Sequence, residues 1–321
     1  MRWGIIGCGD VTETKSGPAL QKAAGSELVA VMRRTGALAE DYARRHGVPR
    51  WHDDADAILH ADDIDAVYIA THPNTHQEYT LRAAAGGKAV YVEKPMAIGE
   101  AECRDMIAAC ASAGVPLWVA YYRRALPRFT RVRQLISEGA IGEVRAVQVL
   151  RSERASPVRW QARAGFSGGG FFFDAACHTL DFLDFCFGPV VEVCGVAARH
   201  HPGHANETTV AASFRFGSGV LGGGTWCYDA ESDVDRTTVI GSAGSLSFCT
   251  ARPEPVQVVR ESTSSEFHLP DPPHVHQPLV QTIVEEFAGR GRCPSTGESA
   301  ARTAHVMDVI LRDVKDELAD R

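Results

Sequence analysis

Short apolar runs alternate with segments of helical spacing over the first 120 residues or so of the chain. The apolar runs cover residues 3–9, 27–34, 66–71, 89–94 and 116–122. In the segments between them, apolar residues recur every three or four positions, which is the spacing of one face of a helix. Strands that alternate with helices are joined by right-handed crossovers and form a parallel sheet. The pattern therefore predicts an α/β domain with a parallel sheet over residues 1–121.

The pattern changes from residue 122 onward. A predicted helix over residues 129–138 leads into a strand, and a second helix covers residues 174–187. Several short strands then follow between residues 190 and 260, separated by glycine, proline or polar turns, as in an antiparallel sheet. Two helices close the chain. Residues 122–321 are therefore predicted to form a second α/β domain with a large, open, mainly antiparallel sheet.

Composition fits this two-domain interpretation. A chain of 321 residues is long for a single core, and its 45% hydrophobic and 23% charged content is ordinary for a soluble globular protein. No apolar run approaches the roughly 20 residues that span a bilayer, so no membrane segment is predicted. The first strand begins almost at once and leaves no room for a secretory leader. Nine cysteines without a C-x-x-C pair indicate reduced thiols, and we expect a cytoplasmic protein.

Charge and histidine spacing argue against two other functions, nucleic-acid binding and metal binding. The net charge of -7 argues against nucleic-acid binding, which depends on neutralising phosphates. The histidines at 200, 201 and 204, together with those at 274 and 276, invite a metal interpretation. No cysteine or carboxylate lies at metal-ligand spacing beside the first group, so a solvated loop is predicted and no metal site.

A glycine-rich turn follows the first predicted strand. Gly7 and Gly9 occupy the first two positions of a dinucleotide-binding fingerprint, Asp10 and Val11 follow them, and Thr12 replaces the third glycine. Glycines at these positions permit a tight turn and a close approach of backbone N–H groups to a pyrophosphate. The position of the turn favours a dinucleotide site over an ordinary turn.

Two arginines end the second predicted strand. An NAD enzyme usually places a carboxylate there for the ribose hydroxyls, whereas arginine accommodates a 2'-phosphate. Arg33 and Arg34 stand at this place without an acidic neighbour, and a guanidinium matches phosphate geometry. We therefore predict NADP(H), with NAD(H) still possible. The alternative is that both arginines are solvated surface charges.

Two more strand ends carry candidate residues. Ligands of open α/β sheets bind outside the carboxyl ends of the strands. Lys94 stands at such an end and is the first candidate for chemistry, although it could also be a surface lysine paired with its neighbour. The residues predicted to bind the nicotinamide end of the cofactor are Thr71, His72, Pro73, His76, Glu93 and Lys94.

A third group of candidates lies on a predicted helix of the second domain. Asp174 and His178 are four residues apart and Asp181 follows three residues later, so all three lie near one helix face. Imidazole suits proton transfer at physiological pH, and a carboxylate one turn away can orient it. The alternative is a helix capped by Asp174 that contains a structural histidine.

The ordered set GCGDVT, THPNTH, EKP and GGG…DAACH resembles the glucose-fructose oxidoreductase/inositol dehydrogenase (Gfo/Idh/MocA) family. The resemblance covers nearly the whole chain, including AYYRRALPRF and PSTGESAART. It implies a Rossmann dinucleotide-binding domain followed by an α/β domain with a large open sheet. In relatives the outer face of that sheet often forms the oligomer interface, so the resemblance implies a homodimer or homotetramer.

The resemblance also implies residue roles. The lysine of the EKP motif, Lys94, would contact nicotinamide and a substrate hydroxyl, and His178 of the Asp174–His178 pair would serve as acid and base. Many relatives have Trp-Arg before the triple glycine, whereas here Trp160 precedes Gln161. Arg163 is a possible substitute for that arginine.

These observations together predict an NADP(H)-preferring oxidoreductase. It would move hydride between nicotinamide and a carbon bearing a hydroxyl or carbonyl, in a sugar, cyclitol or related polyol. His178 would exchange the proton, Asp174 would fix its ring and Lys94 would polarise the oxygen. The residues predicted to line the substrate site are Tyr122, Arg123, Trp160, Asp174 and His178. Two alternatives are a non-catalytic regulator that binds dinucleotide or sugar, and a dihydrodiol dehydrogenase.

Overall fold

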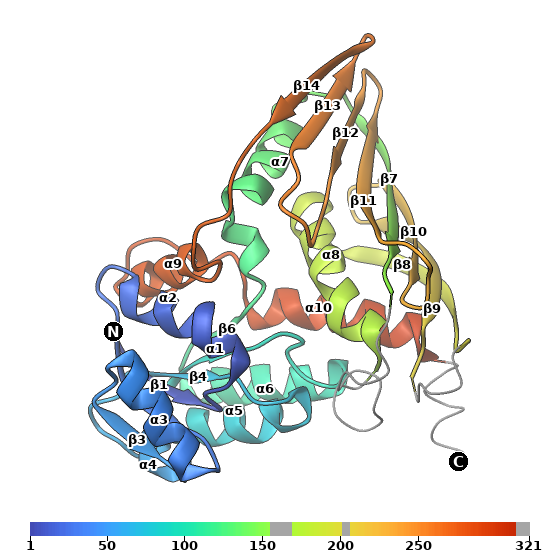
Figure 1. Ribbon diagram of the computed structural model, residues 1–321. Helices are drawn as coiled ribbons and strands as arrows, with labels where there is room; N and C mark the ends of the chain where they lie inside the picture. The colour runs from blue at the N-terminus through green and yellow to red at the C-terminus, as the bar shows by residue number, and fades with distance from the viewer. Residues whose placement is uncertain (155–168, 201–205, 313–321) are drawn as a thin grey trace. The chain divides into compact units, whose positions relative to one another are not determined.

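The structure is a computed structural model that describes residues 1–154, 169–200 and 206–312 (Figure 1). The chain divides into two compact units. The first contains Met1–Leu126 together with Pro272–Ala301, and the second contains Pro127–Asp271 and the chain from Arg302 onward. The predicted boundary between residues 121 and 122 lies close to the first crossing between the units, but the later return of the chain to the first unit was not anticipated.

A six-stranded parallel sheet forms the centre of the first unit, with strand order β3-β2-β1-β4-β5-β6. Its strands are β1 (Arg2–Ile6), β2 (Glu27–Met32), β3 (Arg50–His52), β4 (Ala66–Ile69), β5 (Ala89–Val92) and β6 (Leu117–Val119). The strand order reverses between β1 and β4, so the carboxyl ends of these two central strands flank a topological switch point. The predicted parallel α/β domain is confirmed.

The helices of the first unit follow the strands in the predicted alternation. They are α1 (Asp10–Thr14), α2 (Ser16–Lys22), α3 (Gly36–His46), α4 (Asp56–Leu59), η1 (Pro73–Thr75), α5 (His76–Ala85), α6 (Glu100–Ala113) and η2 (Tyr122–Ala125), with α9 (Gln277–Phe287) from the returning segment. Figure 1 shows α9 beside α2, and the backbone N–H of Ala24, just after α2, donates to Gln281 Oε1 over 2.8 Å.

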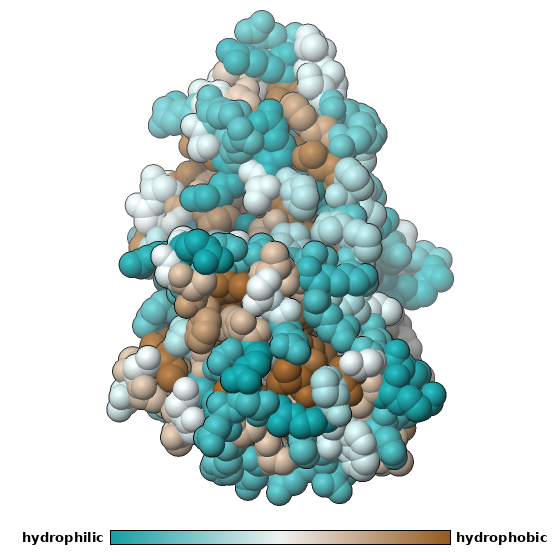
Figure 2. All heavy atoms as spheres, turned by 90° about the vertical axis from the view of Figure 1, so that its left-hand side faces the viewer, coloured by the Kyte–Doolittle hydropathy of each residue, from teal (hydrophilic) through white to brown (hydrophobic). Residues whose placement is uncertain are grey.

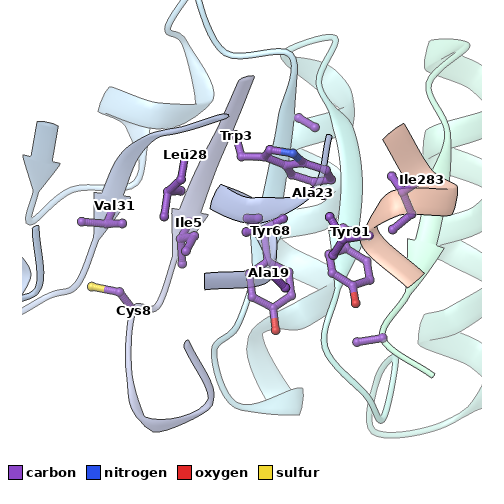
Figure 3. Packing of buried hydrophobic residues seen from close by; sticks show 14 of the residues in the cluster. Trp3, Ile5, Cys8, Ala19, Ala23, Leu28, Val31, Tyr68, Tyr91 and Ile283 are labelled. Atoms are coloured by element: carbon purple, nitrogen blue, oxygen red, sulfur yellow. The ribbon is translucent and has the colours of Figure 1, made fainter. Parts of the chain in front are cut away.

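The returning segment, which is Pro272–Ala301, completes the core of the first unit. Trp3, Tyr68 and Tyr91, from three adjacent strands, lie in one buried cluster with Ile283 of α9 (Figure 3). The other buried apolar residues of α9 are Leu279, Val280 and Val284. The segment also pairs along the sheet, because Thr296 forms an antiparallel bridge with Trp118 of β6. Residues 272–301 therefore belong structurally to the parallel-sheet unit, although they lie in the predicted second domain.

An eight-stranded sheet forms the second unit, with strand order β14-β13-β12-β11-β7-β10-β9-β8. Its strands are β7 (Val144–Ser152), β8 (Val190–Ala198), β9 (Thr209–Phe216), β10 (Leu221–Cys227), β11 (Val234–Gly241), β12 (Ser245–Phe248), β13 (Val256–Arg260) and β14 (Thr263–Phe267). Among the described pairs β7 and β10 are parallel and the others are antiparallel. The predicted large, mainly antiparallel sheet is confirmed.

Helices pack on one face of this sheet. They are α7 (Pro127–Ser137), α8 (Phe171–Phe187) and α10 (Gly297–Ile310), whose first residues belong to the other unit. The ring of Phe182 on α8 lies 4.8 Å from the ring of Phe129 on α7 and 5.5 Å from that of Phe248 on β12. Asp184 on α8 binds the guanidinium of Arg302 on α10 through two bonds of 2.8 and 2.7 Å. The helix that carries the predicted acid–base pair is therefore firmly anchored.

Apolar side chains remain exposed on the strands of this sheet. They are Leu150, Val191, Val196, Leu221, Ile240 and Val259. On the face drawn in Figure 2, hydrophilic residues surround several separate hydrophobic areas. Within the described part of the chain, no helix is long and apolar enough to cross a membrane.

Candidate active site

The turn after β1 brings three strand ends together. The backbone N–H groups of Gly7 and Cys8 both donate to the carbonyl oxygen of Met32 at the end of β2, over 2.9 and 3.0 Å. Gly7 has a φ of +91°, and a Cβ there would lie 2.7 Å from Thr71 Cγ2 just after β4. Only glycine combines this backbone conformation with so close an approach. The fingerprint turn is therefore held at the switch point.

The remaining fingerprint residues shape the start of α1. Among the described residues, a Cβ on Gly9 would meet only Gly7 O, at 3.9 Å, so this part of the chain leaves the turn open on that side. Thr12, at the third glycine position, is buried and donates its hydroxyl to Gly9 O over 2.7 Å. Asp10 is exposed and Val11 half-buried in the first turn of α1. The threonine thus replaces a glycine without opening the turn.

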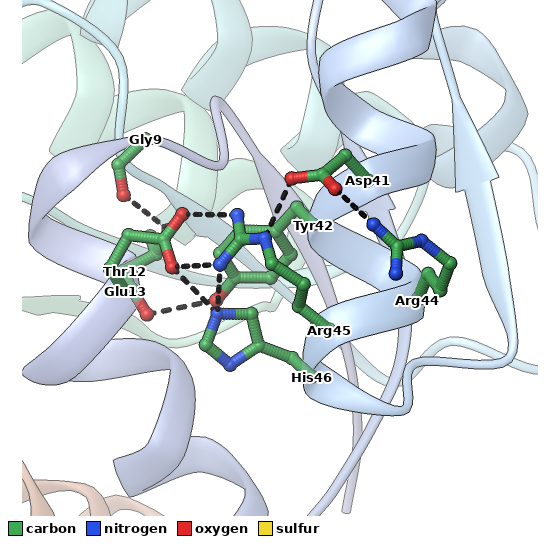
Figure 4. Close-up of polar contacts among 8 residues, drawn as sticks. All are labelled: Gly9, Thr12, Glu13, Asp41, Tyr42, Arg44, Arg45 and His46. Atoms are coloured by element: carbon green, nitrogen blue, oxygen red, sulfur yellow. Dashed lines mark hydrogen bonds and ion pairs between the residues drawn. The ribbon is translucent and has the colours of Figure 1, made fainter.

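A network of charged residues ties α1 to α3 (Figure 4). Arg45 binds Glu13 through two bonds of 2.7 Å and also binds Asp41 over 2.6 Å. His46 Nε2 lies 2.7 Å from Glu13 Oε2, and its ring stacks on Tyr42 at 4.2 Å between centroids. The Arg45 guanidinium is the main cause that lowers the pKa of Glu13 to about 2. This network fixes the helix that begins at the fingerprint.

Arg33 and Arg34 directly follow β2, at the end of the strand where the sequence predicts binding of a 2'-phosphate. Arg33 is half-buried and Arg34 is exposed. Neither guanidinium has an ion-pair or hydrogen-bond partner among the described residues, while the Arg33 backbone N–H donates to His52 O over 3.1 Å. Both charged groups are therefore available to an anionic ligand.

The loop after β4 is fastened from inside by His76. Its ring is fully buried, with Nε2 3.0 Å from Thr71 O and Nδ1 3.0 Å from Pro95 O. Burial lowers the pKa of His76 to about 4. His76 thus joins the THPNTH loop to the EKP loop, whereas the neighbouring His72 is exposed and Pro73 is buried. The ring nitrogens of His76 therefore contact the backbone of these two loops.

The EKP motif follows β5, next to β4 in the sheet. Glu93 is buried, accepts a hydrogen bond of 2.5 Å from the hydroxyl of Tyr68, and accepts one of 3.0 Å from the backbone N–H of Lys94. Burial raises the pKa of Glu93, while Tyr68 and Lys94 oppose that rise. Lys94 itself is half-buried, and its peptide bond to Pro95 is cis. The two charged residues thus differ in placement: Glu93 lies inside the unit and Lys94 near its surface.

One residue of this region was missed by the sequence analysis. His276, from the returning segment, places Nε2 3.6 Å from Glu93 Oε1 and Nδ1 3.1 Å from the hydroxyl of Tyr91. Its ring lies 4.5 Å from that of Tyr122, between centroids. In the sequence His276 was considered only as a metal ligand. No local pattern relates residue 276 to residue 93, so the pairing could not be anticipated.

The predicted substrate-site residues are divided between the units. Tyr122 and Arg123 belong to η2 of the first unit, where the Arg123 guanidinium carbon lies 5.1 Å from the centre of the Tyr122 ring. Trp160, Gln161 and Arg163 lie outside the described residues.

Asp174 and His178 stand one turn apart on α8 in the second unit, as predicted. His178 is 7% exposed and Asp181 is 1% exposed, whereas Asp174 is half-buried. Ala175, which follows Asp174, is also half-buried.

Two glycines account for the position of this helix. A Cβ on Gly170 would lie 2.8 Å from Asn206 Cβ, and the Gly170 N–H donates to Glu207 Oε1 over 2.7 Å. A Cβ on Gly169 would lie 2.7 Å from Phe173 Cβ. Gly170 therefore allows close packing against the segment that precedes β9, and Gly169 allows close packing against the first turn of α8.

The described residues contain no group of three or more histidine, cysteine or acidic side chains that could hold a metal ion. His200 is described, whereas His201 and His204 lie outside the described residues.

Two family models match the chain. Residues 1–121 match the oxidoreductase family with an NAD-binding Rossmann fold, and residues 129–247 match the GFO/IDH/MocA C-terminal domain. The fold and these matches define a class of protein, the two-domain nicotinamide-dependent oxidoreductases. The chain belongs to the GFO/IDH/MocA family, which confirms the resemblance seen in its motifs.

Individual relatives match over almost the whole chain. Oxidoreductase P35 of Formosa agariphila is 37% identical over 97% of this chain and 98% of that protein. The 1,5-anhydro-D-fructose reductase of Ensifer adhaerens is 28% identical over 92% of this chain and 91% of that protein. The crystal structure of aldose-aldose oxidoreductase from Caulobacter crescentus, complexed with glycerol, has a TM-score of 0.89 and 24% identity, covering 99% of this chain and 98% of that chain. This structural similarity shows that each of the two units has the same fold as the corresponding part of that protein.

Proposed function

We propose that this oxidoreductase transfers hydride between a nicotinamide cofactor and a hydroxyl- or carbonyl-bearing carbon of a sugar, cyclitol or related polyol. The observation that carries the proposal is the meeting of three motifs at one sheet edge. The Gly7 turn, the Thr71 loop and Lys94 follow β1, β4 and β5, which are neighbours in the sheet. Similarity to an anhydro-sugar reductase supports the substrate class.

The residues of the first unit fit a dinucleotide. The space beside Gly9 admits a ligand close to the backbone, and the missing side chain at Gly7 lets the turn lie directly against Thr71. In the proposal, Gly7, Gly9, Asp10 and Val11 hold the pyrophosphate, while Thr71, His72 and Pro73 border the nicotinamide half. His76 and Glu93 hold the two loops in place from inside.

The protein's own contribution to the reaction is orientation and the transfer of one proton. When bound, the nicotinamide supplies or accepts the hydride. Lys94 polarises the substrate oxygen with its ammonium group. An imidazole nitrogen of His178 gives or takes the proton of that oxygen, and Asp174, one turn earlier on α8, orients the ring. Tyr122, Arg123 and Trp160 are proposed to recognise the substrate.

We further propose that NADP(H) is preferred over NAD(H). The support is the pair Arg33 and Arg34, whose guanidinium groups have no intramolecular ion-pair partner among the described residues. A 2'-phosphate would supply that partner, and no acidic residue directly follows β2 to bind a free ribose hydroxyl.

Turnover of two alanine variants tests the assignment. The wild-type protein should oxidise NADPH or NADH with members of a keto-sugar panel, or reduce the oxidised cofactors with the matching polyols. Lys94→Ala and His178→Ala should each lower kcat by about two to four orders of magnitude, because each removes a group that acts on the reacting oxygen. The dissociation constant for the cofactor should change by no more than a few-fold.

Matched controls separate chemistry from general damage. Lys22→Ala removes an exposed lysine of α2, and His268→Ala removes an exposed histidine after β14. Both controls should retain wild-type kcat. Wild-type turnover in both Lys94→Ala and His178→Ala would refute the proposed chemistry.

The same panel distinguishes the two alternative functions. A non-catalytic regulator would bind cofactor without turning over any panel member, although such a protein need not retain both Lys94 and His178. A dihydrodiol dehydrogenase would reduce NADP⁺ or NAD⁺ with trans-dihydrodiols in preference to sugars.

We also propose that the protein is a homo-oligomer that associates through the exposed face of the eight-stranded sheet. Ala146 on β7 lies in register between Leu221 on β10 and Ile240 on β11, and both of these large side chains are exposed. Leu150, further along β7, is 48% exposed. A second copy of the chain placed against this face would remove these apolar side chains from water.

A further inference from the structure

A buried polar cluster lies directly behind the EKP motif. Tyr68 donates its hydroxyl to Glu93 Oε1, while Glu93 Oε2 accepts the backbone N–H of Lys94. On the other side of the same carboxylate, His276 Nε2 lies 3.6 Å from Oε1, which is longer than a hydrogen bond, and this nitrogen has no hydrogen-bond partner among the described residues. Tyr91 completes the cluster through its contact of 3.1 Å with His276 Nδ1. Two buried side chains, Tyr68 of β4 and His276 of the returning segment, thus face the Glu93 carboxylate, and Tyr91 of β5 adjoins it through His276.

The surroundings of His276 determine which of its nitrogens carries the proton. A neutral imidazole has one N–H donor and one acceptor nitrogen. With the proton on Nε2, the ring points an N–H at the Glu93 carboxylate and accepts the Tyr91 hydroxyl proton at Nδ1. With the proton on Nδ1, a lone pair would face the carboxylate. Electrostatics therefore favours the Nε2–H form.

His276 also remains neutral, because the groups that surround it disfavour a second proton. Its ring is fully buried, which is the largest cause that lowers its pKa to about 3. Glu93 attracts a proton to the ring, but three nearby cations act against that attraction. The charged and titratable groups facing His276 and Glu93 are Lys15, Tyr68, Tyr91, Lys94, Tyr122 and Arg123.

We propose that His276 is a positioning residue which, through an Nε2–H directed at Glu93, holds the carboxylate that fixes the backbone of Lys94. This inference rests on the proposed function, in which Lys94 acts on the substrate oxygen. His276 does not touch the reacting atoms. Its effect passes through Glu93 to the turn at Lys94, whose ammonium must lie within hydrogen-bond reach of the substrate to be effective.

Loss of the imidazole should remove a favourable N–H dipole that faces the Glu93 carboxylate. The carboxylate would retain the hydroxyl of Tyr68 and the amide of Lys94. With less compensation for its buried charge, it should take up a proton more readily, so the pKa of Glu93 should rise further. Protonated Glu93 binds the Lys94 amide more weakly. The acidic limb of the kcat–pH profile should therefore move to higher pH.

Variants at position 276 test this chain of effects in the full-length protein. His276→Leu removes the N–H dipole and should lower kcat about ten-fold, with little change in cofactor affinity, and should shift the acidic limb upward. His276→Gln supplies an amide N–H near the Nε2 position and should restore most of both properties. Tyr68→Phe, which removes the side-chain hydrogen bond to Glu93, should shift the limb in the same direction.

A matched control lies two residues away. His274 is on the same segment, but its Nδ1 contacts Thr14 O and its Nε2 contacts Lys22 Nζ, so it does not face Glu93. His274→Leu should retain the wild-type kcat and pH profile. A wild-type kcat and acidic limb in both His276→Leu and Tyr68→Phe, while Lys94→Ala abolishes turnover, would overturn the inference and leave the proposed function intact.

A spectroscopic measurement tests the inference without turnover. In protein labelled with ¹⁵N-histidine, the His276 signals can be assigned by their loss in His276→Gln. They should show the Nε2–H form with no titration between pH 5 and 9. A proton on Nδ1, or a ring that titrates in this range, would overturn the inference. The expected spectrum in a protein that turns over no panel member would instead refute the proposed function alone.

Discussion

Replacing Arg33 with aspartate should weaken NADPH binding and leave NADH binding almost unchanged. The Arg33 side chain has no ion pair to lose within the described residues, so the change affects ligand binding more than stability. A hydrogen bond to a charged group contributes about 1.5–3 kcal/mol, which corresponds to roughly ten- to one-hundred-fold in the dissociation constant. The ratio of the NADPH and NADH dissociation constants should rise by this factor. Titration calorimetry measures both dissociation constants. The ionic strength must be kept fixed, because contacts with phosphate weaken as the salt concentration increases.

A control with the same change in net charge isolates the local effect. Arg44 lies on α3, is 73% exposed and pairs with Asp41 over 2.6 Å. Arg44→Asp should leave the ratio of the two constants at its wild-type value. An unchanged ratio in Arg33→Asp and in Arg34→Asp would refute the argument that these guanidinium groups bind a 2'-phosphate.

Two further predictions concern stability and assembly. Because the folded-state pKa of Glu13 is lowered to about 2 from an ordinary 4.5, its pairing stabilises the fold above pH 4.5 and is lost as the pH falls toward 2. Glu13→Gln should therefore lower the unfolding free energy by about 1 kcal/mol at pH 7, a value reduced to allow for solvent screening. In urea unfolding, the difference in unfolding free energy between this variant and the wild type should become smaller from pH 5 to pH 3. A difference that does not change with pH would contradict the link between the Glu13 pKa and stability. Leu221→Glu should reduce the oligomer to smaller species in sedimentation velocity. The control is Leu81→Glu on α5, which changes a comparably exposed leucine of the other unit and should not alter the assembly. An unaltered oligomer in Leu221→Glu would contradict the proposed interface.

Hydrophobic spacing predicted the fold class because both sheets are built from ordinary periodic elements. The runs that became β1, β2, β4, β5 and β6 are short apolar segments with helical segments between them. Two strands escaped notice for identifiable reasons. β3 (Arg50–His52) has a polar residue on each side of Trp51, and β14 (Thr263–Phe267) is polar and largely exposed, so neither carries an apolar signature.

Motifs predicted where the candidate residues lie along the sheet, but not the contacts that surround them. Gly7 could be recognised because its chemistry depends on local backbone conformation, which a short pattern records. His76 was placed in the correct loop, but its burial against Thr71 O and Pro95 O depends on two loops meeting. The contact between His276 and Glu93 spans more than 180 residues of sequence and depends on the return of the chain. A single sequence contains no local signal for such a contact.

The return of the chain to the first unit has a consequence for the order of folding during synthesis. α9 packs beside Trp3 and Ala23, yet the segment that carries it begins about 150 residues after Leu126. At the usual rate of translation, this stretch takes on the order of ten seconds to emerge from the ribosome. The cofactor-binding unit must therefore wait, with part of its apolar surface uncovered, until most of the other unit has been made. A nascent chain paused in that interval would be a natural client for a holding chaperone, and the Rossmann unit would complete its core only near the end of translation.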